Sequence, residues 1–316
     1  MLDVVIIGAG PVGLYASTLA SLHNLQGVVL ESRDIVGGQL SNFYPQKKVI
    51  DVPGFISITA DDFVDSLLKQ NNDRANRLDI KVNETVESFC QSENGYIVTT
   101  NRNEYQTRTI LIATGMGKST PRKMGVDKES QFKNIYYAVK DKYVFKDKDV
   151  VIMGGGDSAV DEALMLQPIA KTVTIVHRRE EFRAQSCSVD LMKERGIKIL
   201  VPYVAKELSG EHEDVTKIIL ENKQDKSDCI EIATDAIVVS YGMVAGRNNF
   251  DLERYGTDVK VYDSYQTSQA NVFAIGNAIN YPGKVKNITC GLGEAVVAIT
   301  KIDQIIHPGK NIPVHF

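Results

Sequence analysis

Two segments of this chain carry nearly the same glycine-rich pattern. Residues 3–13 read DVVIIGAGPVG and residues 149–159 read DVVIMGGGDSA. Each segment is a short apolar run, rich in β-branched residues, that leads into closely spaced glycines and then into a helical pattern. Such a sequence is typical of a buried parallel strand that passes through a tight turn into a helix. We therefore expect the chain to contain one type of nucleotide-binding unit twice.

In the first segment the glycines have the spacing G-x-G-x-x-G, at Gly8, Gly10 and Gly13. The first glycine permits the tight turn, the second lets the backbone approach a pyrophosphate, and the third lets the helix pack closely on the strand. The phosphates would lie at the N-terminus of the helix, where the helix dipole favours negative charge. The alternative is a tight strand–helix turn without a ligand.

Twenty-three positions after the first glycine of each segment comes the residue expected to meet a ribose, Glu31 in the first and His177 in the second. His177 is followed by Arg178 and Arg179, and then by Arg183. A carboxylate accepts hydrogen bonds from a free 2′-hydroxyl, whereas arginines accommodate a 2′-phosphate. We predict FAD in the first site and NADPH, rather than NADH, in the second. The alternative for the second site is a solvated basic run.

The segment after Glu31 supplies further candidate residues for a flavin. Gly37 and Gly38 permit close approach of the backbone, and Gln39 offers both a donor and an acceptor to the edge of a flavin ring. Tyr44 is an aromatic side chain that could stack on that ring. Taken alone, however, Tyr44 is better explained by ordinary packing.

The rest of the chain predicts how the two units are connected. Apolar strands that end in glycine are expected at residues 109–115, 231–242 and 271–277, and a helix at 291–306. This last helix has no third nucleotide to bind, so we expect it to fold back onto the first unit.

The predicted fold class is α/β, with two Rossmann-like dinucleotide-binding domains (three-layer ββα) and the NADPH domain inserted into a split FAD domain. The expected bounds are 1–116 plus 246–316 for the FAD domain and 117–245 for the NADPH domain.

Composition excludes several classes of protein. The net charge of −4 argues against non-specific binding to nucleic acid. No apolar run approaches the length of a membrane span, and Asp3 interrupts any signal-peptide pattern. We expect a cytoplasmic protein with neither a nucleic-acid nor a membrane partner.

The four cysteines are Cys90, Cys187, Cys229 and Cys290. No two of them form a C-x-x-C pair, and their spacing matches no zinc or iron–sulfur pattern. We expect four reduced thiols, mostly buried, and no metal site.

Six motifs occur together and in a fixed order: GAGPVG, GGQL…YPQK…DVPGF, ATG, GGGDSAVDEA, HRREEFRA and YPGKVKNITCGLGEA. Over essentially its whole length the chain resembles the thioredoxin-reductase-like ferredoxin/flavodoxin–NADP⁺ reductases of bacteria. Low-molecular-weight thioredoxin reductases share both glycine motifs and HRR, but they carry a redox C-x-x-C ahead of the second glycine motif. This chain has Tyr137-Ala138-Val139-Lys140 there. Electrons are therefore expected to leave directly from the flavin.

The resemblance implies roles for single residues. Glu31 would hold the adenosine ribose of FAD and Gln39 the flavin, while Tyr44 would stack on the isoalloxazine. Val86 would meet the adenine through its backbone, and Asn277 would contact the ribityl chain or the pyrophosphate. The resemblance also implies a homodimer with non-covalent FAD.

The chain departs from the family's pattern in two places. The last-strand motif of the family ends Gly-Asp, whereas here it ends Gly276-Asn277, so FAD is expected to be held less tightly. The family often has a C-terminal extension that covers one flavin face and supplies a hydroxyl residue. Here His315 and Phe316 are the candidates for part of that role.

The candidate cofactor-binding residues form two sets. The set for FAD is Gly8, Gly10, Pro11, Gly13, Glu31, Gly38, Gln39, Tyr44, Val86, Thr114, Gly115, Gly276 and Asn277. The set for NADP(H) is Gly154, Gly156, Asp157, Ser158, Ala159, His177, Arg178, Arg179 and Arg183. No catalytic side chain is expected, because hydride transfer to a flavin needs no protein acid or base.

The expected function is that of a flavoprotein oxidoreductase, a ferredoxin–NADP⁺ reductase. It would move electrons between NADPH and a small one-electron carrier protein, ferredoxin or flavodoxin, through FAD. One alternative is a thioredoxin-reductase-like disulfide reductase that uses a thiol outside a C-x-x-C. The other is a non-catalytic NADPH or flavin sensor.

A net acidic chain needs local basic residues to dock an acidic carrier. Three basic pairs in the segments assigned to the flavin site are candidates: Lys47 with Lys48, Arg122 with Lys123, and Lys284 with Lys286.

Overall fold

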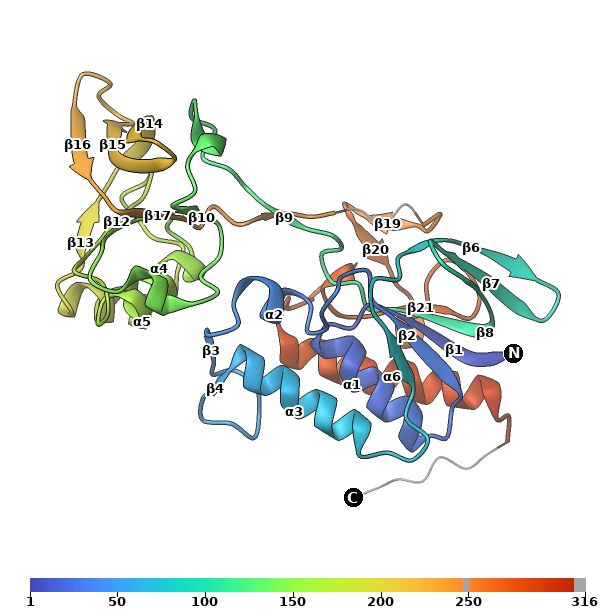
Figure 1. Ribbon diagram of the computed structural model, residues 1–316. Helices are drawn as coiled ribbons and strands as arrows, with labels where there is room; N and C mark the ends of the chain where they lie inside the picture. Colours follow the sequence, from blue (N-terminus) through green and yellow to red (C-terminus); the bar gives the residue numbers. More distant parts are fainter. Residues whose placement is uncertain (247–249, 310–316) are drawn as a thin grey trace. The chain divides into compact units, whose positions relative to one another are not determined.

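The computed structural model describes residues 1–246 and 250–309, and the chain divides into two compact units (Figure 1). Unit 1 comprises Met1–Asn42, Lys48–Lys118 and Ala245–Phe316, and unit 2 comprises Phe43–Lys47 and Ser119–Val244. Most of unit 2 is thus one continuous segment inserted into the chain of unit 1.

The described part of unit 1 contains a seven-stranded sheet. Its strands are, in sheet order, β5 (Asp79–Lys81), β2 (Gly27–Leu30), β1 (Leu2–Ile7), β8 (Glu104–Ile112), β7 (Gly95–Thr100) and β6 (Val86–Ser92), with β21 (Val272–Ala274) beside β8. Strands β5, β2, β1, β8 and β21 pair in parallel, and β8, β7 and β6 pair antiparallel.

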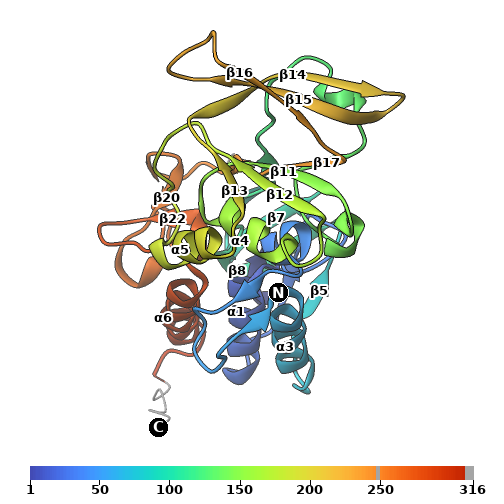
Figure 2. The ribbon, with the colours of Figure 1, turned by 90° about the vertical axis from the view of Figure 1, so that its left-hand side faces the viewer.

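Both faces of β1 are buried, which explains its unbroken apolar sequence. Val4 and Ile6 pack among the residues of a helical layer, whereas Val5 and Ile7 pack on the opposite face. The helical layer consists of α1 (Pro11–Leu22), α3 (Ala60–Asn72) and α6 (Ile288–Ile306), and α1 contacts both of the others (Figures 1 and 2). The last helix therefore folds back onto the first unit, as predicted.

Short elements complete unit 1. A three-stranded sheet packs Val259 and Ile279 against the face of β1 that carries Val5 and Ile7. Its strands are β19 (Arg254–Tyr255), β20 (Asp258–Lys260) and β22 (Ile279–Asn280), and the other short elements are α2 (Gln39–Phe43), β3 (Lys48–Val49) and β4 (Ile58–Thr59).

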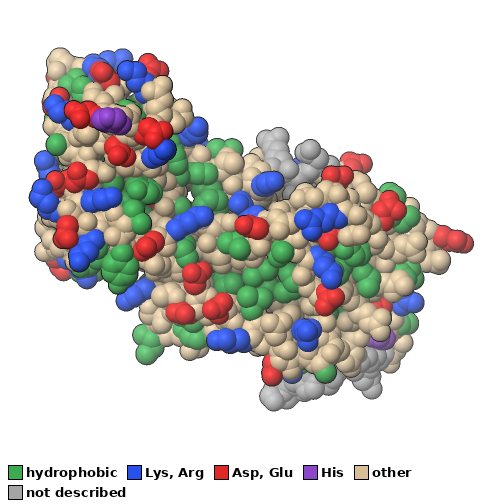
Figure 3. All heavy atoms as spheres, in the orientation of Figure 1, with side chains coloured by type: hydrophobic (Ala, Val, Ile, Leu, Met, Phe, Trp, Pro, Cys, Tyr) green, Lys and Arg blue, Asp and Glu red, His purple; other side chains and the backbone are tan. Residues whose placement is uncertain are grey.

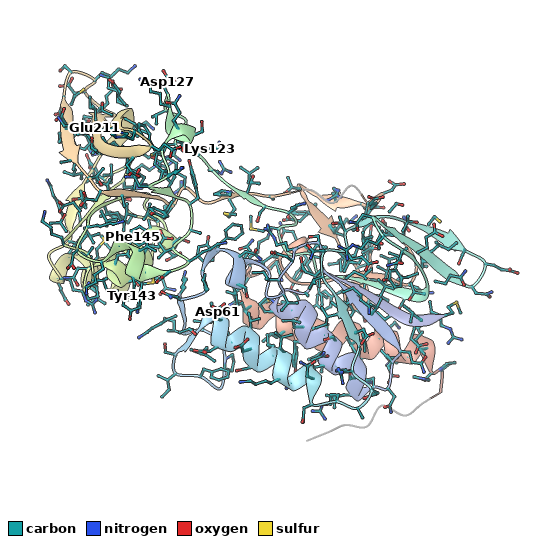
Figure 4. All side chains as sticks on the ribbon, viewed as in Figure 1. Asp61, Lys123, Asp127, Tyr143, Phe145 and Glu211 are labelled. Atoms are coloured by element: carbon teal, nitrogen blue, oxygen red, sulfur yellow. The ribbon has the colours of Figure 1, made fainter. Side chains whose placement is uncertain are left out.

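The described part of unit 2 contains a five-stranded parallel sheet. Its order is β10 (Ile135–Tyr136), β17 (Ala236–Val239), β11 (Asp149–Met153), β12 (Thr172–Val176) and β13 (Lys198–Leu200). Helices α4 (Asp157–Leu166) and α5 (Ser186–Glu194) share a core with Val150 and Ile152 of β11. Phe145, at the end of a 3₁₀ turn, belongs to this core, whereas Tyr143 lies on the surface (Figure 4).

The other face of this sheet packs against an antiparallel sheet of β14 (Tyr203–Glu211), β15 (Asp214–Asn222) and β16 (Cys229–Ala233) (Figure 2). The prediction of a single strand over 231–242 is wrong, because β16 and β17 belong to different sheets. Asp235 causes the break: its N–H donates to the carbonyl of Asp149 at 2.8 Å, and its carboxylate accepts the N–H of Asp149 at 2.8 Å. This exchange fixes the start of β17 beside β11.

At the two points where the chain passes between the units, it forms short paired strands, β9 (Thr120–Pro121) and β18 (Met243–Val244). Gly117 and Gly246 lie next to these strands. A Cβ on Gly117 would lie 1.9 Å from the carbonyl oxygen of Gly246, so the two backbone segments pack too closely for a side chain at residue 117. The predicted fold class, with one domain inserted into a split one, is confirmed. No helix in the described part of the chain is long and apolar enough to cross a membrane.

Candidate functional site

The first glycine turn of unit 1 is built so tightly that side chains are excluded. Gly8 follows β1, and its N–H donates to the carbonyl of Leu30 at 2.8 Å. It has a φ of +104°, and a Cβ there would lie 2.7 Å from the carbonyl oxygen of Ala113. A Cβ on Gly13 would lie 2.0 Å from the carbonyl oxygen of Gly8. Both glycines are therefore required for α1 to start close to β1 and β8.

The N-terminus of α1 is open to an anion. Its N-cap is Gly10, which has no side chain to cap the helix, and the first turn contains no acidic residue. Pro11 occupies the first helical position, where a missing N–H costs nothing. The remaining N–H groups of the first turn have no partner within the helix. These N–H groups at the N-terminus of α1 can bind the diphosphate of a dinucleotide.

Glu31 lies directly beside this turn. Its side chain is buried, and its carboxylate accepts the N–H of Ala9 at 2.9 Å and the N–H of Arg33 at 2.9 Å. These two bonds fix the orientation of the carboxylate. The oxygen that faces Arg33 also accepts the hydroxyl of Ser32 at 3.4 Å, whereas the oxygen that accepts the N–H of Ala9 keeps a lone pair for a further donor, such as a ribose hydroxyl.

Two other predicted segments lie against the same turn. The N–H of Gly37 donates to the carbonyl of Ala9 at 2.8 Å, and a Cβ on Gly38 would lie 3.1 Å from the Cα of Gly10. On another side, a Cβ on Gly276 would lie 3.5 Å from the side chain of Val12.

The structure therefore brings most of the FAD set to the carboxyl ends of β1, β8 and β21. Val86 begins β6, and the nearby N–H of Glu84 donates to the carbonyl of Glu31 at 2.8 Å. The residues of the FAD set at these strand ends and around the glycine turn are Gly8, Gly10, Pro11, Gly13, Glu31, Gly38, Gln39, Thr114, Gly115, Gly276 and Asn277.

Tyr44 is placed differently from the rest of this set. It belongs to the segment Phe43–Lys47, which groups with unit 2. Lys47 of this segment pairs with Asp161 on α4 at 2.7 Å, and its ammonium lies 5.8 Å from the centre of the Tyr44 ring. The side chain of Gln46 accepts the N–H of Lys142 at 3.2 Å.

The glycine turn of unit 2 repeats the geometry of the first one. The N–H of Gly154 donates to the carbonyl of Val176 at 2.9 Å, as that of Gly8 does to Leu30. Gly156 is the N-cap of α4, again without a capping side chain, and a Cβ there would meet nothing within 4 Å. Ala159 takes the position of Gly13 and is fully buried. The open space above Gly156 fits a second dinucleotide.

His177 occupies the place that Glu31 has in unit 1. Its imidazole is buried against Gly155, where a Cβ would lie 2.3 Å from the ring, and its Nε2 has no hydrogen-bond partner among the described residues. Burial lowers the pKa of His177, and the charges of Arg178, Arg179 and Arg183 lower it further, so the ring is neutral at neutral pH. Gly155 was not among the predicted residues, although the run of three glycines was a signal for it.

The loop after β12 folds back onto the glycine turn. The N–H of Arg183 donates to the carbonyl of Gly155 at 2.7 Å, and the N–H of Gln185 donates to the carboxylate of Asp157 at 2.9 Å. The side chains of Arg178, Arg179 and Arg183 are exposed, and none forms an ion pair with another described residue. Three guanidinium groups are therefore available beside this turn to bind a phosphate.

Comparisons with known proteins agree with this geometry. The chain matches the protein family described as pyridine nucleotide-disulphide oxidoreductase over residues 2–300. It belongs to this family. It is 41% identical to a ferredoxin–NADP reductase of Acholeplasma laidlawii, covering 98% of this chain and 96% of that protein. It is 38% identical to a ferredoxin–NADP reductase of Streptococcus thermophilus, covering 99% and 96%.

Among solved structures, thioredoxin reductase from T. acidophilum is similar with a TM-score of 0.84 and 25% identity, covering 96% of this chain and 98% of that one. Thioredoxin reductase from Lactococcus lactis has a TM-score of 0.82 and 24% identity, over 97% and 99%, and supports the fold alone. Together these matches confirm the predicted family, the flavoprotein oxidoreductase class and the cofactors FAD and NADP(H).

Tyr137, the first residue of the segment that the sequence pattern matches to a redox C-x-x-C, has a structural role in this chain. The hydroxyl of Tyr137 donates to the carboxylate of Glu129, which also accepts the N–H groups of Met124 at 2.8 Å and Gly125 at 2.9 Å. Burial, reinforced by this carboxylate, raises the pKa of Tyr137 well above its usual value. Tyr137 therefore stays protonated and anchors the loop before β10.

The prediction that the cysteines are mostly buried is wrong. All four are free, with Cys90, Cys187 and Cys229 exposed and Cys290 half-buried. Cys90 lies on the outward side of β6, Cys187 in the first turn of α5, and Cys229 at the start of β16. These are polar edges of the units, where the thiol faces solvent rather than a core.

The prediction that Lys284 docks a partner protein is also wrong. The side chain of Lys284 is fully buried and pairs with buried Glu294, so it cannot meet a partner protein. Lys47 and Lys286 pair with Asp161 and Asp258, each at 2.7 Å. On the face shown in Figure 3, basic and acidic side chains are interspersed over each unit.

The remaining predictions concern metals and the C-terminus. Within residues 1–246 and 250–309 there is no group of three or more His, Cys, Asp or Glu side chains that could hold a metal. His315 and Phe316 lie outside the described residues.

Proposed function

We propose that this protein is a cytoplasmic ferredoxin–NADP⁺ reductase, which moves electrons between NADPH and a ferredoxin or flavodoxin. Unit 1 would hold FAD and unit 2 would hold NADP(H). The homodimer expected from the family resemblance forms part of this proposal.

The main support is the contrast between the two glycine turns. Both are open at the helix N-terminus, but a buried carboxylate lies beside the first turn. A neutral imidazole lies beside the second, followed by three arginines that form no ion pair within the described part of the chain. Glu31 suits the hydroxyl groups of the FAD ribose. Arg178, Arg179 and Arg183 suit the 2′-phosphate of NADPH.

The residues of this chain bind and orient the cofactors. When bound, FAD would supply the redox chemistry that links a two-electron donor, NADPH, to a one-electron carrier. The helix N-termini at Gly10 and Gly156 would hold the diphosphates, and Glu31 would fix the adenosine end of FAD. Tyr137 at the C-x-x-C position supports direct transfer from the flavin to the carrier, because a tyrosine cannot take the place of the thiol.

The test uses the purified protein under anaerobic conditions. We expect a flavin absorbance spectrum that NADPH bleaches, followed by reduction of cytochrome c that requires added ferredoxin or flavodoxin. FAD binding without NADPH oxidation, even with an artificial acceptor, would instead indicate a sensor. If NADPH is oxidised only when a disulfide substrate is present and is reduced, the protein is a disulfide reductase.

A further inference from the structure

A carboxylate is buried in the helix that closes unit 1. Glu294 lies on α6, is 1% exposed, and shares the buried face of that helix with small and apolar residues and with one other acid, Asp303. One oxygen of its carboxylate accepts the N–H of Gly276 at 2.7 Å. Gly276 belongs to the turn after β21, where the FAD site is proposed.

The other oxygen of Glu294 has three donors. The ammonium of Lys284 pairs with it, the hydroxyl of Tyr281 donates to it at 2.8 Å, and the thiol of Cys290 lies 3.4 Å away. The side chain of Lys284 has no exposed surface. Both oxygens of the carboxylate are thus hydrogen-bonded, and the positive charge of Lys284 lies against the negative charge of Glu294.

Such a pair is expensive to bury, because both ions lose their hydration. An apolar pair of the same volume would pack as well, so the ionic pair points to a role other than stability. Removing one partner would leave a buried charge without compensation.

The position of this pair connects it to the glycine turn of unit 1. A Cβ on Gly291 would lie 2.6 Å from the side chain of Val12 and 3.3 Å from the Cα of Gly276. The first turn of α6, the turn at Gly276 and the start of α1 therefore meet at one point. Glu294 lies one helical turn beyond Gly291, which lets its carboxylate reach the backbone of Gly276.

We propose that Lys284 and Glu294 are positioning residues for the flavin: Glu294 fixes the Gly276–Asn277 turn, and Lys284 keeps the local charge at zero. This inference rests on the proposed placement of FAD in unit 1. Neither residue was among the predicted cofactor-binding residues. The signal was a glutamate within residues 291–299, a stretch of the last helix that is otherwise small and apolar.

The test compares Glu294→Gln, Lys284→Met and the double variant with the wild type. Each single variant is expected to bind FAD at least about tenfold more weakly in titrations of the apoprotein, because the turn loses a charge-assisted bond or is left beside an unpaired charge. The flavin midpoint potential should be highest for Glu294→Gln, which leaves a positive charge, and lowest for Lys284→Met. The double variant should have a potential near that of the wild type.

Lys286→Met is the matched control, since it removes an exposed lysine of the same loop that pairs with Asp258 at 2.7 Å. Lys286→Met should change neither the affinity for FAD nor the flavin midpoint potential. Lys284→Arg keeps the charge and should keep the potential, which provides a second test if the methionine variant fails to fold. FAD affinities within about twofold of the wild type, or potentials in another order, would overturn the inference. Absence of FAD from the wild-type protein would instead overturn the proposed function.

Discussion

Glu31 and His177 occupy matching places beside the two glycine turns. Each side chain limits the size of the residue that it contacts in its turn, Ala9 in the first and Gly155 in the second. The carboxylate of Glu31 accepts the N–H of Ala9, so a methyl group fits at that position. The ring of His177 covers Gly155 and leaves no room for one. On the proposed assignment of FAD to unit 1 and NADP(H) to unit 2, the two turns therefore differ in their packing as well as in the arginines.

Arg178→Ala combined with Arg179→Ala should raise the KM for NADPH by about ten- to a hundredfold for each arginine removed and leave the KM for NADH almost unchanged. Each charge-assisted bond to the 2′-phosphate is worth about 1.5–3 kcal/mol, and exposure places the effect at the lower end. Steady-state kinetics with both nucleotides measures this. Arg195→Ala, an exposed arginine at the end of α5, is the control. An unchanged preference for NADPH would refute the assignment.

Glu162 gives a prediction about pH. Its carboxyl is buried on α4, its partner is the hydroxyl of Ser240, and burial raises its pKa from 4.5 to about 7. The folded protein therefore holds a proton that the unfolded chain has lost between these two values. The stabilising contribution of that proton is complete below pH 4.5 and is lost as the pH rises through about 7.

Glu162→Gln should remove this dependence. The free energy of unfolding of the variant should be similar to that of the wild type at low pH and higher above neutral pH, by up to on the order of 3 kcal/mol. Denaturant unfolding across the pH range measures the difference. Glu194→Gln, an exposed glutamate on α5, should follow the wild-type curve. If the free energies of unfolding of Glu162→Gln and the wild type change with pH in parallel, the pKa of Glu162 is not raised in the folded protein, which would contradict the prediction.

At the scale of elements, the two strand–turn–helix units differ in how closely the helix approaches the strand. In unit 1 a Cβ at Gly13 would overlap the carbonyl oxygen of Gly8, at 2.0 Å. In unit 2 the same position is Ala159, whose methyl group is accommodated in the core. The sequence alone showed this difference but not its cause.

Gly13→Ala should therefore destabilise unit 1 by at least about 2 kcal/mol and abolish stoichiometric FAD binding, because α1 must move away from β1. The mirror change, Ala159→Gly, should cost about 1 kcal/mol, the usual cost of glycine in a helix, and preserve NADPH binding. Bound FAD per chain and thermal unfolding measure both effects. Equal losses in the two variants would mean that the turns are not distinguished by their packing.

The sequence predicted the elements that have a strong local pattern. The strand and helix around each glycine motif, the last helix and the insertion of one domain into the other all follow from apolar runs and glycine spacing. The break between β16 and β17 was missed, because it depends on hydrogen bonds between Asp235 and the distant Asp149. The exposure of the thiols and the burial of Lys284 were missed for the same reason: long-range packing decides them.

At the scale of the whole molecule, a chain with a net charge of −4 is expected to meet the proposed acidic carrier through local basic residues. Of the six candidates, Lys48, Arg122 and Lys123 are exposed and form no ion pair with another described residue (Lys123 is labelled in Figure 4). Arg122→Glu with Lys123→Glu should slow reduction of the carrier most at low salt, where screening is weak. Reduction of ferricyanide should change little, and Lys198→Glu should have no effect. If the carrier rate at low salt does not change, docking occurs elsewhere.

The central claim is that electrons pass from NADPH through FAD to a carrier protein without a thiol relay. The most direct test is the rate of carrier-dependent cytochrome c reduction by a variant in which all four cysteines are serine. We predict that this variant retains the carrier-dependent rate of the wild type, because Tyr137 stands where the redox thiol would be and all four cysteines are unpaired. Loss of that rate in a variant that still binds FAD would contradict the account and identify a thiol as the route by which electrons leave the flavin.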